Sequence, residues 1–299
     1  MICEILGTLN IIEKAGRFVG WVRKTRKPPS ESVSSRFIQL FESHDVHRNQ
    51  IPRFFGHGLT VKDLQDETAL IGKLDEPVLD AACSLFGVRR EWLEGAESQV
   101  YSCHDFYKHP EDMAPFLTAL KEKNPEGGLD GILIAPTEKA GDALIILSEV
   151  IGGVGEKPIY RYHLCNNWLF DYWKSRAYLT AFVAIAWKHG VHIRGGSLPS
   201  KAIKRIAEGE ALLVSEDGNA LGRYGKLWYP EDMALKPDDY LAGVDPELKG
   251  FGVKAALSLW LELEENGYMS TGLPMYSRES VRTSFEQTLE NITPSFCGS

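Results

Sequence analysis

The sequence predicts an α+β fold in which a helical bundle precedes a mixed domain. From residue 34 to residue 97, apolar residues recur at helical spacing in short bursts. Three strand-like runs follow further along the chain, joined by short, glycine-bearing connections. Residues 168–188 are apolar almost all round, which is typical of a buried helix. Together these patterns predict helices first, then a sheet with a long helix packed against it.

Composition places the chain among ordinary globular proteins. Its 299 residues are 43% hydrophobic and 25% charged, which leaves room for two domains. The net charge of −8 excludes nucleic-acid binding through overall charge, so any such contact needs a local basic patch. The five cysteines are odd in number and form no CxxC pair. This pattern favours reduced thiols, and we expect a cytoplasmic protein.

Residues 1–27 predict an amphipathic helix that Pro28 and Pro29 end. Charged residues interrupt its apolar run, so we expect no transmembrane segment. Three interpretations stay open: an oligomerising helix, a helix on an anionic membrane surface, and a helix packed on its own domain. We favour a homo-oligomer, because the apolar residues follow a heptad rhythm at Ile2, Ile5, Leu9, Ile12, Gly16 and Val19.

The bundle resembles a known DNA-binding domain. Three segments carry the likeness: RNQIPRFFG (48–56), LTVKDLQ (59–65) and LDAACSLFGVRREWLEGA (79–96). Over residues 34–96 they are similar to the Cro/lambda-repressor (XRE-type) helix-turn-helix family. Pro52 departs from the family pattern, which usually has Ala there. The matching residues are Gln50, Ile51, Gly56, Leu59, Thr60, Leu64, Phe86, Gly87, Val88, Trp92 and Leu93.

This resemblance implies five helices over residues 34–97 and double-stranded DNA as the partner. In the family, the third helix enters the major groove and the second crosses the backbone. Asn and Gln side chains can pair with adenine, Lys with guanine, and Arg with phosphate. The implied function is a DNA-binding transcriptional regulator. The residues expected to contact DNA are Arg48, Asn49, Gln50, Arg53, Thr60, Lys62, Asp63 and Gln65.

The charge of the bundle points the other way. Residues 34–97 contain seven Lys or Arg against eleven Asp or Glu. Asp63, Asp66 and Glu67 lie on or beside the expected reading helix, where phosphates would repel them. The alternative function is therefore an assembly or protein-interaction protein that keeps a degenerate helix-turn-helix fold and does not bind DNA.

Residues 111–299 predict an α+β domain of the sensor type. After a helix from Glu111, strands are expected at 131–136, 143–152 and 157–165 as an antiparallel meander. The buried helix at 168–188 packs across it. A strand at 191–194, a glycine turn at 195–197 and a helix from residue 200 follow. Residues 230–246 read as an acidic loop, and further helices are expected at 248–266 and 278–290.

Two kinds of site were considered in this domain. Trp168, Tyr172, Trp173 and Arg176 are candidates for binding an aromatic or anionic small molecule, the alternative being plain core residues. A metal-dependent enzyme is the third hypothesis, because histidines and cysteines are scattered along this half of the chain. Their spacing lacks the paired ligands of a zinc site, so we assign no metal ligand, catalytic residue or cofactor. The residues concerned are Cys103, His104, His109, His163, Cys165, His189 and His192.

Overall fold

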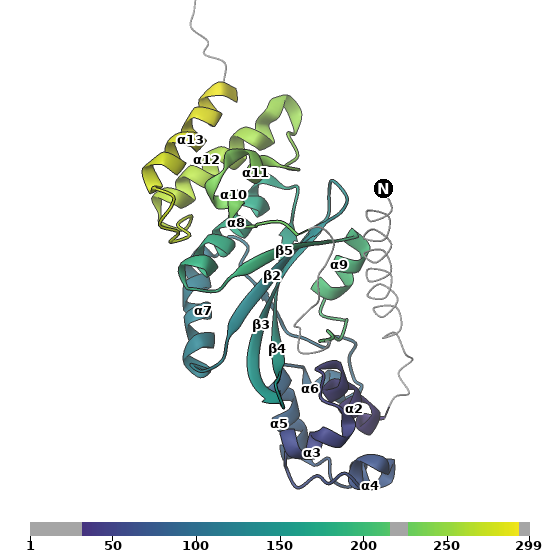
Figure 1. The fold of residues 1–299 in the computed structure, drawn as a ribbon. Coiled ribbons are helices and arrows are strands. Elements are labelled where there is room, and N and C mark those ends of the chain that lie inside the picture. Colours follow the sequence, from purple (N-terminus) through teal and green to yellow (C-terminus); the bar gives the residue numbers. More distant parts are fainter. Residues whose placement is uncertain (1–31, 216–226, 293–299) are drawn as a thin grey trace, which may run out of the picture.

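A five-stranded mixed sheet lies at the centre of the computed structural model (Figure 1). The structure describes residues 32–215 and 227–292. The expected helix at 1–27 lies outside these residues. The strands run β1–β4–β3–β2–β5 across the sheet. Their bounds are β1 (Cys103–Asp105), β2 (Leu129–Pro136), β3 (Asp142–Val154), β4 (Lys157–Leu169) and β5 (Ile193–Leu198).

Three of these strands form the predicted antiparallel meander. β2 pairs with β3, and β3 pairs with β4, through the short connections that the glycines indicated. The sheet is nevertheless not purely antiparallel, because β1 joins β4 and β5 joins β2 in parallel. The helices that precede β2 and β5 supply the crossovers that these parallel edges need. An α+β fold is confirmed.

The expected glycine turn at 195–197 is wrong, since all three residues lie inside β5. Gly195 pairs with Leu133 of β2 and donates its backbone N–H to the carbonyl of Trp228. A Cβ at Gly195 would lie 2.5 Å from the Trp228 ring. The glycine is therefore needed because an indole packs flat against the strand.

Helices cover both faces of the sheet (Figure 1). One face packs against α7 (Pro110–Lys123) and α8 (Trp173–Lys188), and α8 in turn packs against α12 (Phe251–Glu265). The other face packs against α9 (Ser200–Ala207). The predicted acidic loop at 230–246 is partly helical, and the predicted last helix is confirmed. These elements are α10 (Asp232–Leu235), α11 (Pro237–Leu241), η3 (Leu248–Gly250) and α13 (Arg278–Ile292).

The predicted long helix at 168–188 is confirmed in its main part, but it begins five residues later than expected. Trp168 and Leu169 instead continue β4, where they pair with Ala143 and Asp142 of β3. These two apolar residues, which the helical pattern assigned to the helix, are therefore paired in the strand instead. No helix within 32–215 or 227–292 is long and apolar enough to cross a membrane.

The helical unit, residues 33–94, consists of short helices and single 3₁₀ turns. Asp75 caps the start of its longest later helix, α5, and Gly87 ends it in the left-handed conformation. Phe37, Phe41 and Phe86 lie in its core. Its elements are α2 (Val33–Ser43), η1 (Arg48–Gln50), α3 (Ile51–Phe54), η2 (Asp63–Gln65), α4 (Glu67–Ile71), α5 (Glu76–Phe86) and α6 (Arg90–Glu94).

The core of the helical unit continues into the sheet. Buried residues of α2 and α5 belong to the same apolar cluster as buried residues of β2, β3 and β4. His44 lies at the junction, with its ring 4.3 Å from the Phe86 ring and 5.5 Å from the Tyr162 ring. Residues 34–97 therefore share a core with the sheet, and their division into a separate domain stays a prediction.

Candidate functional site

The first half of the expected DNA-reading surface is a short, self-capped turn. Arg48, Asn49 and Gln50 form η1, which leads directly into the four-residue helix α3. The Gln50 side chain accepts a hydrogen bond from the backbone N–H of His47, 3.1 Å away. Arg48 pairs with Glu42 at 3.6 Å. The Asn49 side chain accepts a hydrogen bond from Gln65, so the helical unit itself holds all three side chains.

The expected recognition helix is replaced by the 3₁₀ turn η2, which holds only residues 63–65. Thr60 donates from its backbone N–H and its hydroxyl to the carboxylate of Asp63, at 2.8 and 2.7 Å. These hydrogen bonds lower the pKa of Asp63. The turn ends at Asp66, which is extended and caps the next helix, α4. The prediction of a full helix here is wrong, because Asp66 starts a new helix instead of continuing the turn.

A polar groove of about 380 Å³ lies between α2, η1, η2 and α4. Arg48 and Gln65 line it, and the Gln65 amide donates to the Asn49 side chain at 3.0 Å. Glu42 and Glu67 also line the groove, so carboxylates stand beside the residues that would meet phosphate. The other expected DNA contacts do not line the groove; they are Asn49, Gln50, Arg53, Thr60, Lys62 and Asp63.

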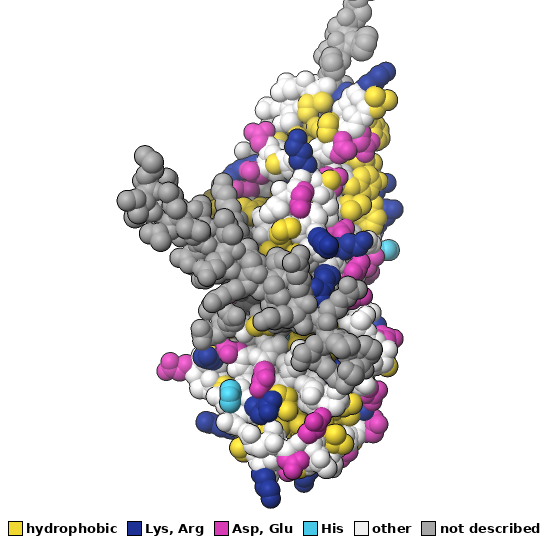
Figure 2. Space-filling view, turned by 90° about the vertical axis from the view of Figure 1, so that its right-hand side faces the viewer, with side chains coloured by type: hydrophobic (Ala, Val, Ile, Leu, Met, Phe, Trp, Pro, Cys, Tyr) yellow, Lys and Arg dark blue, Asp and Glu magenta, His cyan; other side chains and the backbone are white. Residues whose placement is uncertain are grey.

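Most basic side chains of the helical unit already have partners. Arg36 is buried and donates to the carbonyl of Trp92. Arg89 pairs with Glu97 at 2.6 Å, and Arg90 is surrounded by three acidic side chains. Acidic and basic side chains are interspersed over the lower part of Figure 2, where the helical unit lies. Three basic residues of the range 34–97, all of which the structure describes, form neither an ion pair nor a side-chain hydrogen bond to a backbone carbonyl: Arg53, Lys62 and Lys73.

Two of the four candidate ligand-binding residues are fully used within the fold. Trp168 is 1% exposed, and its indole N–H donates to the carbonyl of Cys165. The Arg176 guanidinium is fully buried and donates to the carbonyls of Phe170, Tyr240 and Ala242. Burial lowers the pKa of Arg176 to about 10. Arg176 thus joins the start of α8 to α11 and to the residue after β4, whereas the Trp168 hydrogen bond lies within β4.

Tyr172 and Trp173 lie at a partly exposed aromatic surface beside the start of α8. The Tyr172 and Trp173 rings are 5.7 Å apart, and Trp173 meets Phe251 edge-on at 6.0 Å. Burial and the neighbouring Tyr172 raise the pKa of Tyr107 to about 12. The structure therefore does not bring the four candidate residues together around one pocket.

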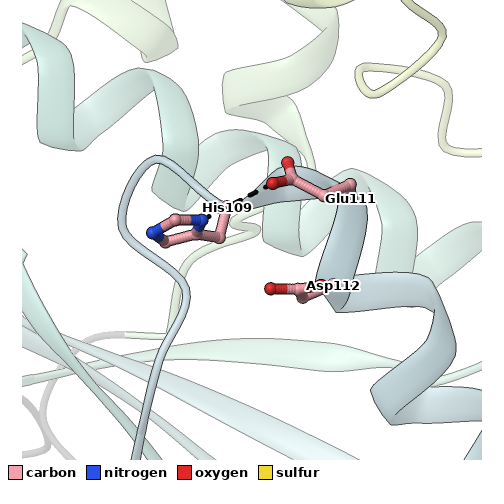
Figure 3. A group of neighbouring side chains, drawn as sticks. All are labelled: His109, Glu111 and Asp112. Atoms are coloured by element: carbon pink, nitrogen blue, oxygen red, sulfur yellow. Dashed lines mark ion pairs between the residues drawn. The ribbon is translucent and has the colours of Figure 1, made fainter.

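Among the described residues, one group that includes a candidate histidine could hold a metal ion. His109, Glu111 and Asp112 can bring their ligand atoms within 4.8 Å of one another, and Figure 3 shows all three at the start of α7. All three are exposed. Acidic residues in the first turn also complement the helix dipole, which explains this cluster without a metal.

A buried polar cluster on the sheet was not predicted. Glu149 of β3 is 4% exposed, and His163 of β4 donates to it at 2.8 Å. Burial opposes ionisation of Glu149, but the hydrogen bond from His163 and the charge of Arg161 lower its pKa. Arg161 also donates to the carbonyl of Leu85 near the end of α5. The signal was available: Arg161 and His163 are two residues apart in a strand, hence on one face.

This cluster joins the helical unit to the sheet. The ring of His104 in β1 lies 6.2 Å from that of His163, and burial together with His163 lowers the pKa of His104. Cys103 and Cys165 lie on the neighbouring strands β1 and β4, and burial raises the pKa of both thiols. Neither is poised as a nucleophile.

Comparisons with protein-family models, with curated proteins and with solved structures found no match.

Proposed function

We propose that this chain is an assembly protein whose helical unit is a structural and interaction element and does not read DNA. The observation that carries the proposal is the charge arrangement of the helical unit. Proteins that bind duplex DNA neutralise several phosphates, commonly about six to ten. Residues 34–97 carry a net charge of −4, and only three of their basic residues are exposed and form no ion pair, which is too few for that.

The short length of η2, which replaces the expected recognition helix, supports the same proposal. A recognition helix presents side chains from successive turns to the base edges. Here η2 is one turn, and Thr60, Asp63 and Gln65 are hydrogen-bonded within the helical unit. The partner that we propose is a second copy of the chain, associated through the heptad pattern of residues 2–19.

Sedimentation velocity of the full chain tests the assembly role. Leu9→Lys places a charge at a heptad position, whereas Thr8→Lys adds the same charge beside it. We expect concentration-dependent association that Leu9→Lys abolishes and Thr8→Lys preserves. A chain that stays monomeric at all concentrations, or two variants that behave alike, would contradict the proposal.

A DNA-binding regulator is the second candidate, favoured by Arg53 and Lys62, which are exposed and form no ion pair. Fluorescence anisotropy with mixed genomic duplexes separates the two functions. A regulator would bind at low salt, lose affinity steeply between about 50 and 200 mM salt, and be weakened by Lys62→Glu. The assembly protein is expected to show no such binding.

A further inference from the structure

An apolar surface lies where α8 and α12 begin. η3 leads directly into α12, and its first residue, Leu248, is 83% exposed, the highest value for a large apolar side chain in the described part of the chain. Phe251, the first residue of α12, is 56% exposed. Its ring meets the partly buried Trp173 of α8 edge-on at 6.0 Å. Single exposed apolar residues are common on proteins, but a group of them indicates an interaction site.

The backbone beside Leu248 is strained. Glu247 and Lys249, on either side of it, have φ of 53° and 57°. Residues with a side chain rarely adopt positive φ, and such strain is found most often at functional sites. The inward side of α12 is already buried in the core through Leu257 and Trp260. The core therefore does not account for the conformation that holds Leu248 outward.

Charged residues of both signs surround this surface. Glu247 is exposed at one end, where Asp245 accepts a hydrogen bond from the backbone N–H of Glu247. Lys254 lies one turn beyond Phe251 on α12. A partner of a single sign would be repelled at one end, whereas in a two-fold contact between copies the acidic residues of one meet the basic residues of the other. Within the described residues no ion pair forms at the charged side chains here, which are Asp171, Lys174, Asp245, Glu247, Lys249 and Lys254.

We infer that this surface, formed by Trp173, Leu248 and Phe251, binds the same surface of a second copy of the chain. About a two-fold axis near Phe251, the first turns of α12 from the two copies run antiparallel. Glu247 comes four residues before Phe251 and Lys254 comes three residues after it. Glu247 of each copy therefore faces Lys254 of the other, while Leu248 and Phe251 lose their exposure to water.

The contact is small, because stable interfaces bury about 800 Å² on each partner. Leu248, Phe251 and the exposed part of Trp173 cover only a fraction of that area. We expect it to form between copies that residues 2–19 join, so the inference rests on the proposed assembly role. Joined copies present the surface to each other at a high effective concentration, which lets a weak contact tighten the assembly.

Sedimentation velocity of the full chain over a range of concentrations tests the inference. Leu248→Ser removes an exposed apolar side chain from both sides of the contact, so we expect the dissociation constant to rise at least about tenfold. Met275→Ser is the matched control, because Met275 is 78% exposed but lies in the connection between α12 and α13. This variant is expected to associate like the wild type.

Exchange of charges tests the two-fold arrangement. Glu247→Lys and Lys254→Glu each place like charges opposite each other, so self-association of either variant should weaken by about threefold or more. An equal mixture of the two variants pairs opposite charges at both positions. We expect mixed assemblies to form about as tightly as the wild type.

Two results would overturn the inference: a dissociation constant unchanged in Leu248→Ser, or a mixture that associates no more tightly than its components. If Leu9→Lys leaves association unchanged while Leu248→Ser weakens it, the role of residues 2–19 fails and the inference stands. Binding to phosphatidylserine vesicles that Leu248→Ser abolishes, with self-association unchanged, would assign the surface to a membrane instead.

Discussion

Acidification is expected to weaken the junction between the helical unit and the sheet through His44. Its ring is fully buried between Phe86 and Tyr162, and burial lowers its pKa to about 4, partly offset by a hydrogen bond to the Leu40 carbonyl. Above pH 6.5 the imidazole is neutral in both the folded and the unfolded chain, so it carries no penalty. Between pH 6.5 and pH 4 the unfolded chain binds the proton and the folded chain does not.

The size of this effect follows from the two pKa values. An unfolded value of 6.5 and a folded value of about 4 correspond to about 3 kcal/mol of the free energy of unfolding, lost as the pH falls from 7 to 4. Other groups also titrate in this range, His104 among them. The effect of His44 is therefore measured as a difference between the wild type and His44→Phe.

Urea denaturation at pH 7 and at pH 4 provides the measurement. The wild type should lose about 3 kcal/mol more than His44→Phe over this interval. His192→Gln changes an exposed histidine and serves as the control, with a loss like that of the wild type. Equal losses in the wild type and His44→Phe would refute the reasoning, since His44 would then not be the group excluded from protonation.

Three further substitutions test contacts that the fold depends on. Arg176→Leu leaves the buried Tyr240 carbonyl and the partly buried Phe170 and Ala242 carbonyls without this donor. The free energy of unfolding by urea should therefore fall by roughly 3 kcal/mol, and a loss under about 1 kcal/mol would contradict the role of Arg176. Gly195→Ala places a methyl group against Trp228 and should cost about 1 to 3 kcal/mol in thermal unfolding. Gly128→Ala is the control, because this glycine has no positive φ and an added Cβ would meet only Val150, at an ordinary 3.7 Å. Glu149→Gln removes the buried charge that His163 and Arg161 face. The free energy of unfolding at pH 7 should fall by roughly 3 kcal/mol. An unchanged urea midpoint would show that the cluster does not stabilise the junction.

Local patterns predicted the sheet better than the helical unit. The meander followed from three apolar runs and their glycine-bearing connections, because alternation and turn chemistry act within a few residues. The start of α8 was placed too early because Trp168 fits a helical pattern as well as a strand. The full recognition helix was wrong because Asp66, three residues beyond Asp63, caps a new helix.

The candidate sites depended on contacts between distant parts of the chain. Arg176 was considered for anion binding, yet carbonyls of Tyr240 and Ala242 occupy its donors from more than sixty residues away. The ring of Trp260 in α12 stacks on Phe285 of α13 at 3.6 Å, a contact that exists only because the two helices pack together.

The sequence by itself determined the fold class, the order of most elements and the acidic balance of the helical unit. These properties follow from composition, periodicity and capping, which depend on residues that are close together in the sequence. Tertiary structure decided that the helical unit and the sheet share a core, and which cations are already paired. Periodicity reports which face of an element is apolar, whereas the partner of that face comes from a distant segment that only folding brings near.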